Sequence, residues 1–206
     1  MYKRIDFYTE EDCEKWEKSK KDPKLLVPID PYDGKSVKDP DSRRRIDNQC
    51  RKYRNFLEDD IRRAIKRDDD LIFLDIITKF NIDAEKYFDD LVNLNSFNIL
   101  TLLFDNSVFN EETLLSYPEA LHIGAENGYV ETVDVLIAYG ADIDYLDEEG
   151  NSALLLASDS GFYEIVELLL ENNADPTLVN NRGYTAIDLA ADDYMAELIE
   201  SYLVEF

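Results

Sequence analysis

The sequence predicts an all-α solenoid, in which short helix-turn-helix units stack side by side. Three observations carry this prediction. The C-terminal half repeats itself at a 33-residue step, which aligns Ala120-Leu121 with Ala153-Leu154 and with Ala186-Ile187. A period of that length is typical of stacked repeat proteins. Within each unit, apolar residues recur at helical spacing. The hydrophobic fraction, 45% of 206 residues, is large enough to bury a continuous core.

The three clearest units share the same order of elements. They are expected at residues 117–149, 150–182 and 183–206. In the second, Ser152–Ser158 predicts a short helix, Gly161 a turn, and Tyr163–Leu170 a second helix with an apolar stripe. Asn173 then stands where the second helix must end in a left-handed residue, and Gly140 fills that position one unit earlier. An extended segment leads to the next unit.

A weaker unit precedes these three. One 33-residue step back from Leu136 reaches Leu103, which predicts an outer helix over Phe97–Phe104, with Leu91-Val92 in its inner partner. Ser107 falls at the helix-ending position.

The earliest unit is weaker still. Ile61–Ile65 and Leu71–Ile77 predict a further helix pair that lacks the glycine turn. We therefore expect about five units over residues 58–206, with the first two degenerate and the first serving as a cap.

These residues resemble the ankyrin repeat. The family pattern is Gly-x-Thr-Pro-Leu-His-x-Ala-Ala, a glycine turn, Ile-Val-x-x-Leu-Leu, then Gly-Ala-Asp. The chain offers Ala120-Leu121-His122, Gly128, Val133-x-x-Leu136-Ile137 and Gly140-Ala141-Asp142, and it opens its last unit with Gly183-Tyr184-Thr185-Ala186. It departs from the pattern because the Thr-Pro proline is missing and His122 is its one motif histidine. The resemblance implies a concave protein-binding face, made of inner helices and of finger loops between units.

Residues 1–57 differ in character and are expected to form a small, turn-rich helical unit. Cys13 lies on one expected short helix, Arg43–Leu57 on another, and Asp30–Val37 forms a turn between them. Cys13, this turn and Ile46–Cys50 resemble the two-cysteine adaptor domain found in proteins of large DNA viruses. Asp replaces the motif Asn at Asp30 and the motif Thr at Asp33. The resemblance implies a viral protein that acts in an infected cell.

Two cysteines and one histidine leave few options for metal or redox chemistry. A zinc site usually needs four ligands, so Cys13 and Cys50 do not predict one. A disulfide between them is open, and two packed thiols are the preferred interpretation for a reducing cytosol. His122 could act as a base or a ligand, but its place in the ankyrin pattern implies a structural role that links neighbouring loops.

Charge separates the two parts of the chain. Residues 1–57 hold 15 Lys or Arg and 12 Asp or Glu, whereas residues 116–206 hold 20 Asp or Glu and one basic residue, Arg182. An acidic surface repels nucleic acid, so no direct nucleic-acid partner is expected. The negative charge of the repeats either keeps the array soluble or attracts a partner with a basic surface. Solubility is the preferred interpretation.

The sequence predicts neither an enzyme nor a secreted or membrane-bound protein. The acidic N-terminus lacks the apolar core of a signal peptide, and no apolar run is long enough for a membrane span. A cytoplasmic location is therefore expected, in the host cell if the protein is viral. No phosphate loop, dinucleotide turn or nucleophile elbow is present. Acidic runs such as Asp68–Asp70 lack the ligand spacing of a calcium-binding loop. No cofactor or metal is expected.

The expected function is a non-catalytic protein-interaction adaptor. The position of each residue within its repeat predicts which side chains the concave face exposes without a role in core packing. Leu146 and Val179 occupy the same such position in successive units and form an apolar pair. The expected contact residues are Glu126, Asn127, Leu146, Glu148, Glu149, Asn151, Asp159, Ser160, Val179, Asn181, Arg182, Tyr184, Asp192 and Asp193. The alternative is an acidic mimic of nucleic acid that sequesters a basic nucleic-acid-binding protein.

Overall fold

The computed structural model describes residues 10–21, 40–80 and 82–203, and all regular secondary structure in those ranges is helical. The helices are α1 (Glu10–Lys21), α2 (Pro40–Lys66), α3 (Asp70–Phe80), the 3-10 turn η1 (Glu85–Tyr87), α4 (Phe88–Asn93), α5 (Phe97–Asp105), α6 (Glu111–Ser116), α7 (Ala120–Asn127), α8 (Val130–Ala138), α9 (Ala153–Ser160), α10 (Tyr163–Glu171) and α11 (Asp193–Leu203). The chain divides into two compact units, residues 1–63 and 64–206, and the division falls within α2.

Helix α2 corrects one expectation about the N-terminal half. The separate helices expected at Arg43–Leu57 and Ile61–Ile65 are one continuous helix of 27 residues. Pro40 occupies its first position, where the missing amide proton of proline costs nothing. No glycine or second proline follows before Lys66, so nothing in the sequence ends the helix between the two expected segments.

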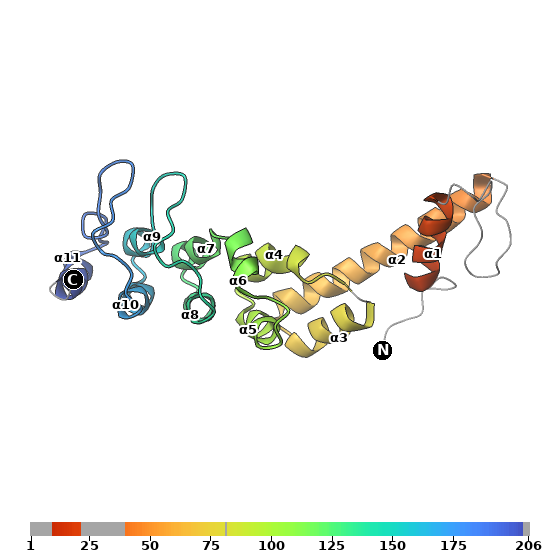
Figure 1. Cartoon of the computed structure of the whole chain (residues 1–206), viewed down its shortest axis with the longest axis horizontal. Helices are drawn as coiled ribbons and strands as arrows, with labels where there is room; N and C mark the ends of the chain where they lie inside the picture. The colour runs from red at the N-terminus through yellow and green to blue at the C-terminus, as the bar shows by residue number, and fades with distance from the viewer. Residues whose placement is uncertain (1–9, 22–39, 81, 204–206) are drawn as a thin grey trace. The chain divides into compact units, whose positions relative to one another are not determined.

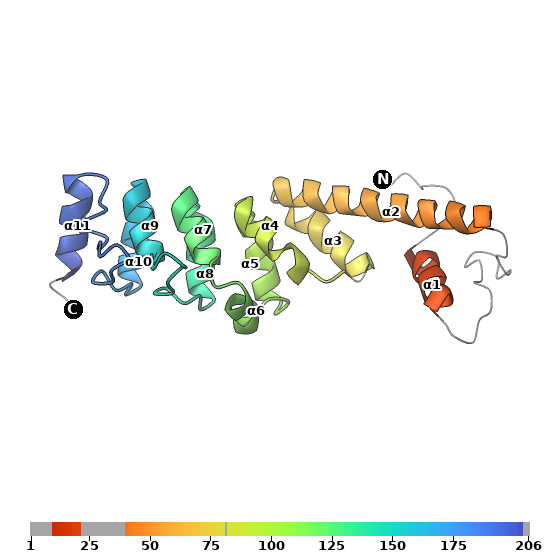
Figure 2. The same cartoon turned by 90° about the horizontal axis from the view of Figure 1, so that it is seen from above.

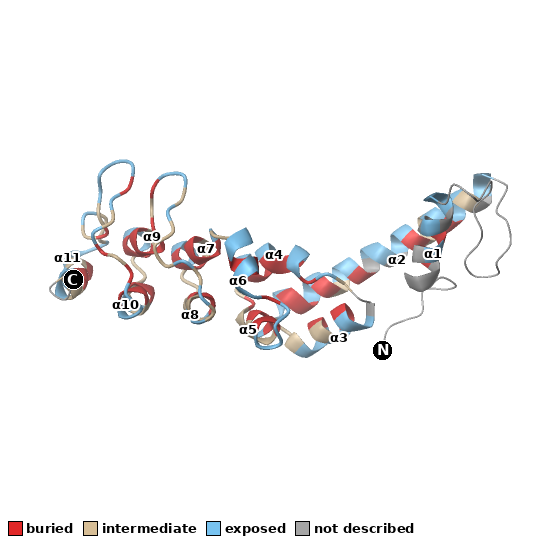
Figure 3. Ribbon diagram, viewed as in Figure 1, coloured by how far each residue is buried: buried red, intermediate tan, exposed pale blue. Residues whose placement is uncertain are grey.

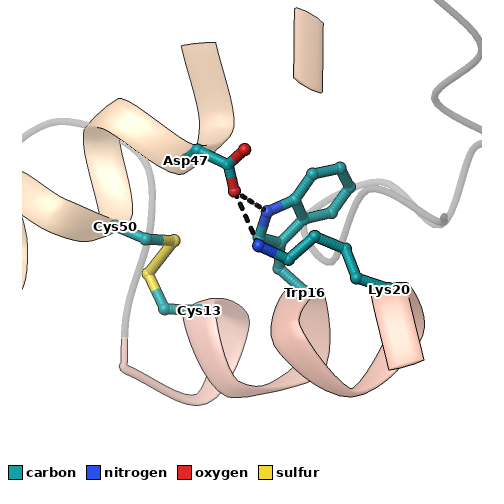
Figure 4. A network of polar contacts seen from close by, with 5 residues as sticks. All are labelled: Cys13, Trp16, Lys20, Asp47 and Cys50. Carbon is teal, nitrogen blue, oxygen red and sulfur yellow. Dashed lines mark hydrogen bonds and ion pairs between the residues drawn. A yellow bond between two sulfur atoms is a disulfide. The ribbon is translucent and has the colours of Figure 1, made fainter. Parts of the chain in front are cut away.

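Unit 1 is held by a small cluster in which a disulfide joins α1 to α2. Cys13, Trp16, Ile46 and Cys50 are buried together. Cys13 and Cys50 form a disulfide with Cα atoms 5.5 Å apart (Figure 4), so the preferred interpretation of two packed thiols is wrong for this structure. Their spacing along the chain, 37 residues, does not reveal that proximity. The expected turn at Asp30–Val37 lies outside the described residues.

A polar network flanks this disulfide. The indole N–H of Trp16 donates to Asp47 Oδ1 at 2.7 Å, and Lys20 Nζ donates to the same oxygen at 2.9 Å (Figure 4). Desolvation opposes ionisation of Asp47, but the hydrogen bonds from Trp16 and Lys20 outweigh it and hold the pKa of the carboxyl below its usual 3.8. The buried tryptophan thus has its one polar atom satisfied, as burial of an indole requires.

Unit 2 is a stack of helix pairs. Helices α4, α7 and α9 pack in sequence along an inner row, and α3, α5, α8, α10 and α11 pack along an outer row (Figures 1 and 2). Each inner helix also packs on the outer helix that follows it, as α7 does on α8. Buried residues gather where the helices face one another (Figure 3). Leu121, Val133 and Leu154 are among the buried residues of unit 2. This arrangement confirms the predicted all-α solenoid.

Left-handed residues mark the turns of this stack every 33 positions. Asn95, Gly128 and Gly161 have positive φ between inner and outer helices, and Ser107, Gly140 and Asn173 have positive φ after the outer ones. The φ values of Ser107 and Asn173 are 56° and 66°, which confirms their predicted equivalence to Gly140. The repeat of turn geometry therefore extends one unit further towards the N-terminus than the glycines themselves.

Helix α6 occupies a position where later units have a loop. One 33-residue step forward from its bounds reaches residues 144–149, which carry no helix. The side chain of Asn110 accepts from the amides of Glu112 and Thr113, and the Thr113 hydroxyl accepts from the amide of Asn110. This reciprocal cap supplies partners for the first amides of the helix, which stabilises one short helix in place of a finger loop.

The last unit differs from the others in its inner element. Residues 186–189 form turns, and only α11 is a full helix. The Asp188 carboxylate accepts from the amide and the hydroxyl of Thr185, at 2.9 and 2.7 Å. Both bonds lower the pKa of Asp188, and the bond from the Thr185 amide contributes most. Because Asp188 and Thr185 satisfy each other over a single turn, the segment is closed without a longer helix.

Candidate partner-binding face

Two loops project beside the inner helices of unit 2. The first finger comprises residues 141–151, between α8 and α9, and the second comprises residues 174–184, between α10 and the closing unit. Figure 1 shows both loops, teal and blue, rising on the side of α7 and α9 and away from α8 and α10. The inner helices and the fingers therefore share one side of the stack.

Hydrogen bonds hold the two fingers together. The Asn181 amide donates to the Glu149 carbonyl and its side-chain nitrogen to the Glu148 carbonyl, each at 3.0 Å. At the base, Asn180 Nδ2 donates to Asn151 Oδ1 at 3.0 Å, and the Asn151 amide donates to Asp147 Oδ1 at 2.7 Å. Bonds between adjacent loops restrict the motion of one loop relative to the other.

His122 links α7 to the first finger. Its Nε2 lies 2.9 Å from the Asn151 carbonyl oxygen, and its ring packs edge-on against Tyr145 with centroids 5.6 Å apart. Because a carbonyl can only accept, Nε2 must carry the proton. The side chain is 5% exposed, and Nδ1 has no hydrogen-bond partner. This contact matches the loop-linking role that the ankyrin resemblance implied.

All but one of the fourteen expected contact residues are exposed. The exception is Asn151, which is half-buried at the base of the first finger. Leu146, Val179 and Tyr184 are 40%, 54% and 46% exposed, which is high for large apolar side chains. The remaining exposed members are Glu126, Asn127, Glu148, Glu149, Asp159, Ser160, Asn181, Arg182, Asp192 and Asp193.

Three of these residues also have structural duties, which corrects the expectation that all are free of packing. Asn151 and Asn181 make the finger bonds described above. Asp192 accepts from the Met195 amide at 2.9 Å, at the start of α11, and from the Tyr163 hydroxyl. The Tyr163 hydrogen bond is the main cause of a lowered pKa for Asp192. Repeat register identifies exposed positions but not the bonds that cross from one repeat to the next.

A groove of about 530 Å³ between α7 and the first finger brings part of the expected set together. Its lining includes the expected residues Glu126, Glu148, Glu149 and Asn151, together with His122. Sequence reasoning missed the other four lining residues, which are Glu119, Ile123, Asp147 and Leu156. Spacing could have indicated two of them, because residues 119, 122, 123 and 126 share one helix face. The expected residues on α9, the second finger and α11 do not line this groove.

The groove is acidic throughout. Five of its nine lining residues are carboxylates, and its one other ionisable side chain is His122. Carboxylates crowded around one cavity repel each other and attract a cation. The described residues hold no cluster of three or more His, Cys, Asp or Glu side chains placed to bind a metal ion.

Comparison with known proteins agrees with the helix pairs and their fingers. A family model of ankyrin repeats, covering three copies, matches residues 91–180 and 121–206. The chain belongs to the ankyrin-repeat family. The match begins within α4, so it includes one of the two degenerate units that precede the clear repeats. A search of curated proteins found no match. Ankyrin repeats generally mediate protein–protein interaction.

Within residues 10–21, 40–80 and 82–203, no helix combines the length and the apolar character needed to cross a bilayer.

Proposed function

We propose that the ankyrin array is a non-catalytic adaptor that holds one protein partner on its finger side. The observation that supports it best is the pair of fingers bonded to each other, with Leu146, Val179 and Tyr184 exposed beside an acidic groove. Exposed aromatic and aliphatic side chains supply binding energy, and the ordered backbone lowers the entropy cost of association. The surrounding carboxylates favour a partner with a basic surface.

A second candidate is the acidic mimic of nucleic acid. The five carboxylates of the groove favour it, because a row of negative charge can compete with phosphates for a basic protein. The two candidates differ in salt dependence. A phosphate mimic loses affinity steeply as salt rises, whereas a partner anchored on Leu146, Val179 and Tyr184 keeps most of its affinity.

For unit 1 we propose an adaptor role of the two-cysteine type found in proteins of large DNA viruses. The joining of Cys13 to Cys50 supports this, since the motif places two cysteines at those positions. The protein would then act in the cytoplasm of an infected cell. Acid quenching of intact cells, followed by alkylation in denaturant, tests the redox state of the pair in place. Cys13 and Cys50 are buried, so the label is counted on unfolded protein: two labelled thiols mean that the pair is reduced in the cell, and an unlabelled pair means that the disulfide of the structure persists there.

The binding face can be tested by affinity capture with matched variants. The test variant carries Leu146→Ser, Glu148→Gln, Glu149→Gln and Tyr184→Ser. The control variant carries the same kinds of change on exposed positions outside the fingers, namely Leu71→Ser, Glu131→Gln, Glu164→Gln and Tyr194→Ser. Captured proteins are quantified by mass spectrometry against the unchanged chain.

The outcomes separate the candidates. Loss of a captured protein with the test variant alone supports the finger face. Equal capture by all three chains contradicts it. A partner that is lost with the test variant, competes with DNA or RNA and elutes at modest salt favours the nucleic-acid mimic instead.

A further inference from the structure

A second cavity lies next to the acidic groove and has the opposite character. It has a volume of about 300 Å³ and lies between the α6–α7 segment and the start of the first finger. Its walls are mainly apolar, with Leu114, Leu115 and Pro118 on one side and Ala141 and Tyr145 on the other. Glu111 and Asp142 are the two charged residues in its lining.

The two cavities are neighbours, and we refer to the two together as the trough. Residues 111–121 and then 119–126 line one side, while residues 140–145 and then 147–151 line the other. The edge-on contact between Tyr145, which lines the apolar cavity, and His122, which lines the acidic groove, marks where they meet. A ligand that lies along the trough therefore meets an apolar pocket first and a ring of carboxylates next.

Two features show that no described side chain fills the trough or neutralises its charge. Leu115 is 79% exposed, the highest value among the large apolar side chains described. The five groove carboxylates have no lysine or arginine among the other lining residues.

We propose that this trough binds an extended segment of a partner protein in which an apolar side chain is followed closely by an arginine. The apolar side chain fills the pocket beside Leu115. The arginine enters the acidic groove, where its planar guanidinium can bond more than one carboxylate and stack on an aromatic ring such as that of Tyr145. Charge complementarity selects the basic residue, and the pocket beside Leu115 sets its register.

The proposal rests on the adaptor function and goes further, because it names the chemistry of the partner and adds α6 to the binding surface. In this chain α6 stands where later units have a finger, and it supplies Leu114 and Leu115. The apolar half of the trough is thus a product of the degenerate unit rather than of the regular repeats.

The probe is a library of random dodecapeptides displayed on phage and selected on the full oxidised chain at low salt. Enriched peptides are then synthesised, and their affinities are measured by fluorescence polarisation. The trough variant carries Leu115→Ser and Glu119→Gln, which are exposed residues outside the set altered in the capture experiment. The matched control carries Leu71→Ser and Glu131→Gln, and a finger variant carries Leu146→Ser, Val179→Ser and Tyr184→Ser.

We expect enriched peptides to pair an apolar residue with a nearby arginine, and to bind the trough variant about tenfold or more weakly while binding the control unchanged. Replacing that arginine by glutamine should weaken binding to the unchanged chain but matter less for the trough variant. The proposal is overturned if nothing is enriched, if the enriched peptides lack arginine, or if the trough variant binds them normally. Loss of peptide binding with the finger variant alone would retain the adaptor face while rejecting the trough.

Discussion

Reduction of the disulfide should unfold unit 1 and expose Trp16 to water. In the described part of this unit, Cys13, Trp16, Ile46 and Cys50 form the buried cluster that joins α1 to α2. A small core of this kind seldom supplies more than about 3–5 kcal/mol of stability. The disulfide spans 37 residues, and the loop-closure entropy for that length corresponds to about 3.8 kcal/mol at 25 °C. Its loss is therefore comparable to the whole stability expected for the unit.

Tryptophan fluorescence measures this event without interference from the repeats. Trp16 is the one tryptophan in the sequence and is fully buried, and both cysteines lie in unit 1. We expect blue-shifted emission from the oxidised chain, with a cooperative red shift in urea. The reduced chain, and a Cys13→Ser/Cys50→Ser variant, should show red-shifted emission without urea, while thermal unfolding of the ankyrin helices followed by circular dichroism stays unchanged.

One result would refute the reasoning. If thiol titration shows both cysteines free while the emission stays blue-shifted, and the urea midpoint falls by less than the equivalent of about 1 kcal/mol, packing rather than the covalent bond holds α1 in place. A chain carrying Asp47→Asn serves as a control, because it weakens the bonds to Trp16 and Lys20 but keeps the disulfide.

Two further predictions concern the ankyrin units. Gly140→Ala should cost about 1 kcal/mol, since its φ of 93° strains an L residue but an added Cβ meets nothing within 4 Å. Gly128→Ala should lower the free energy of unfolding in urea by about 1–2 kcal/mol more than Gly140→Ala does, because the new Cβ would lie 2.6 Å from the Phe162 ring. Equal losses for the two variants would contradict this. The hydrogen bond to Asp192 raises the pKa of Tyr163 above 10.0, so the bond stabilises the fold below pH 10 and is lost as pH rises through the raised pKa. As pH rises from 10 through the raised pKa, the Tyr163→Phe variant should therefore lose less stability than the unchanged chain. Urea midpoints that fall equally with pH in both chains would argue against the bond.

The 33-residue period predicted the regular part of the fold because each unit repeats the same local chemistry. One 33-residue step back from Leu136 reaches Leu103 in α5. The predicted left-handed residues, Ser107 and Asn173, follow the ends of α5 and α10. Where the units diverge, local capping decides. The Asn110–Thr113 cap produces α6, which register alone assigns to a loop. The absence of a helix breaker after Pro40 merges two expected helices into α2.

The candidate site was predictable in position but not in chemistry. Register identified Glu126, Glu148 and Glu149, which do line one groove. It could not identify the bonds of Asn151 or Asn181, because these depend on the distance between fingers rather than on spacing within a unit. The disulfide was left open, with packed thiols preferred, because a sequence separation carries no information about the distance between two Cα atoms.

The left-handed turns also make the chain easy to shorten or lengthen by whole units. Gly140 and Asn173 end successive outer helices with φ of 93° and 66°, and each precedes an Ala-Asp pair. A deletion of residues 141–173 would join Gly140 to Ala174, so the backbone would pass from one unit to the next through a turn of the same kind. Because a repeat contacts mainly its neighbours, such a change leaves the trough-side helices α6 and α7 in place while removing one finger. Whole-unit insertion or deletion therefore changes the length of the stack without requiring a new kind of turn.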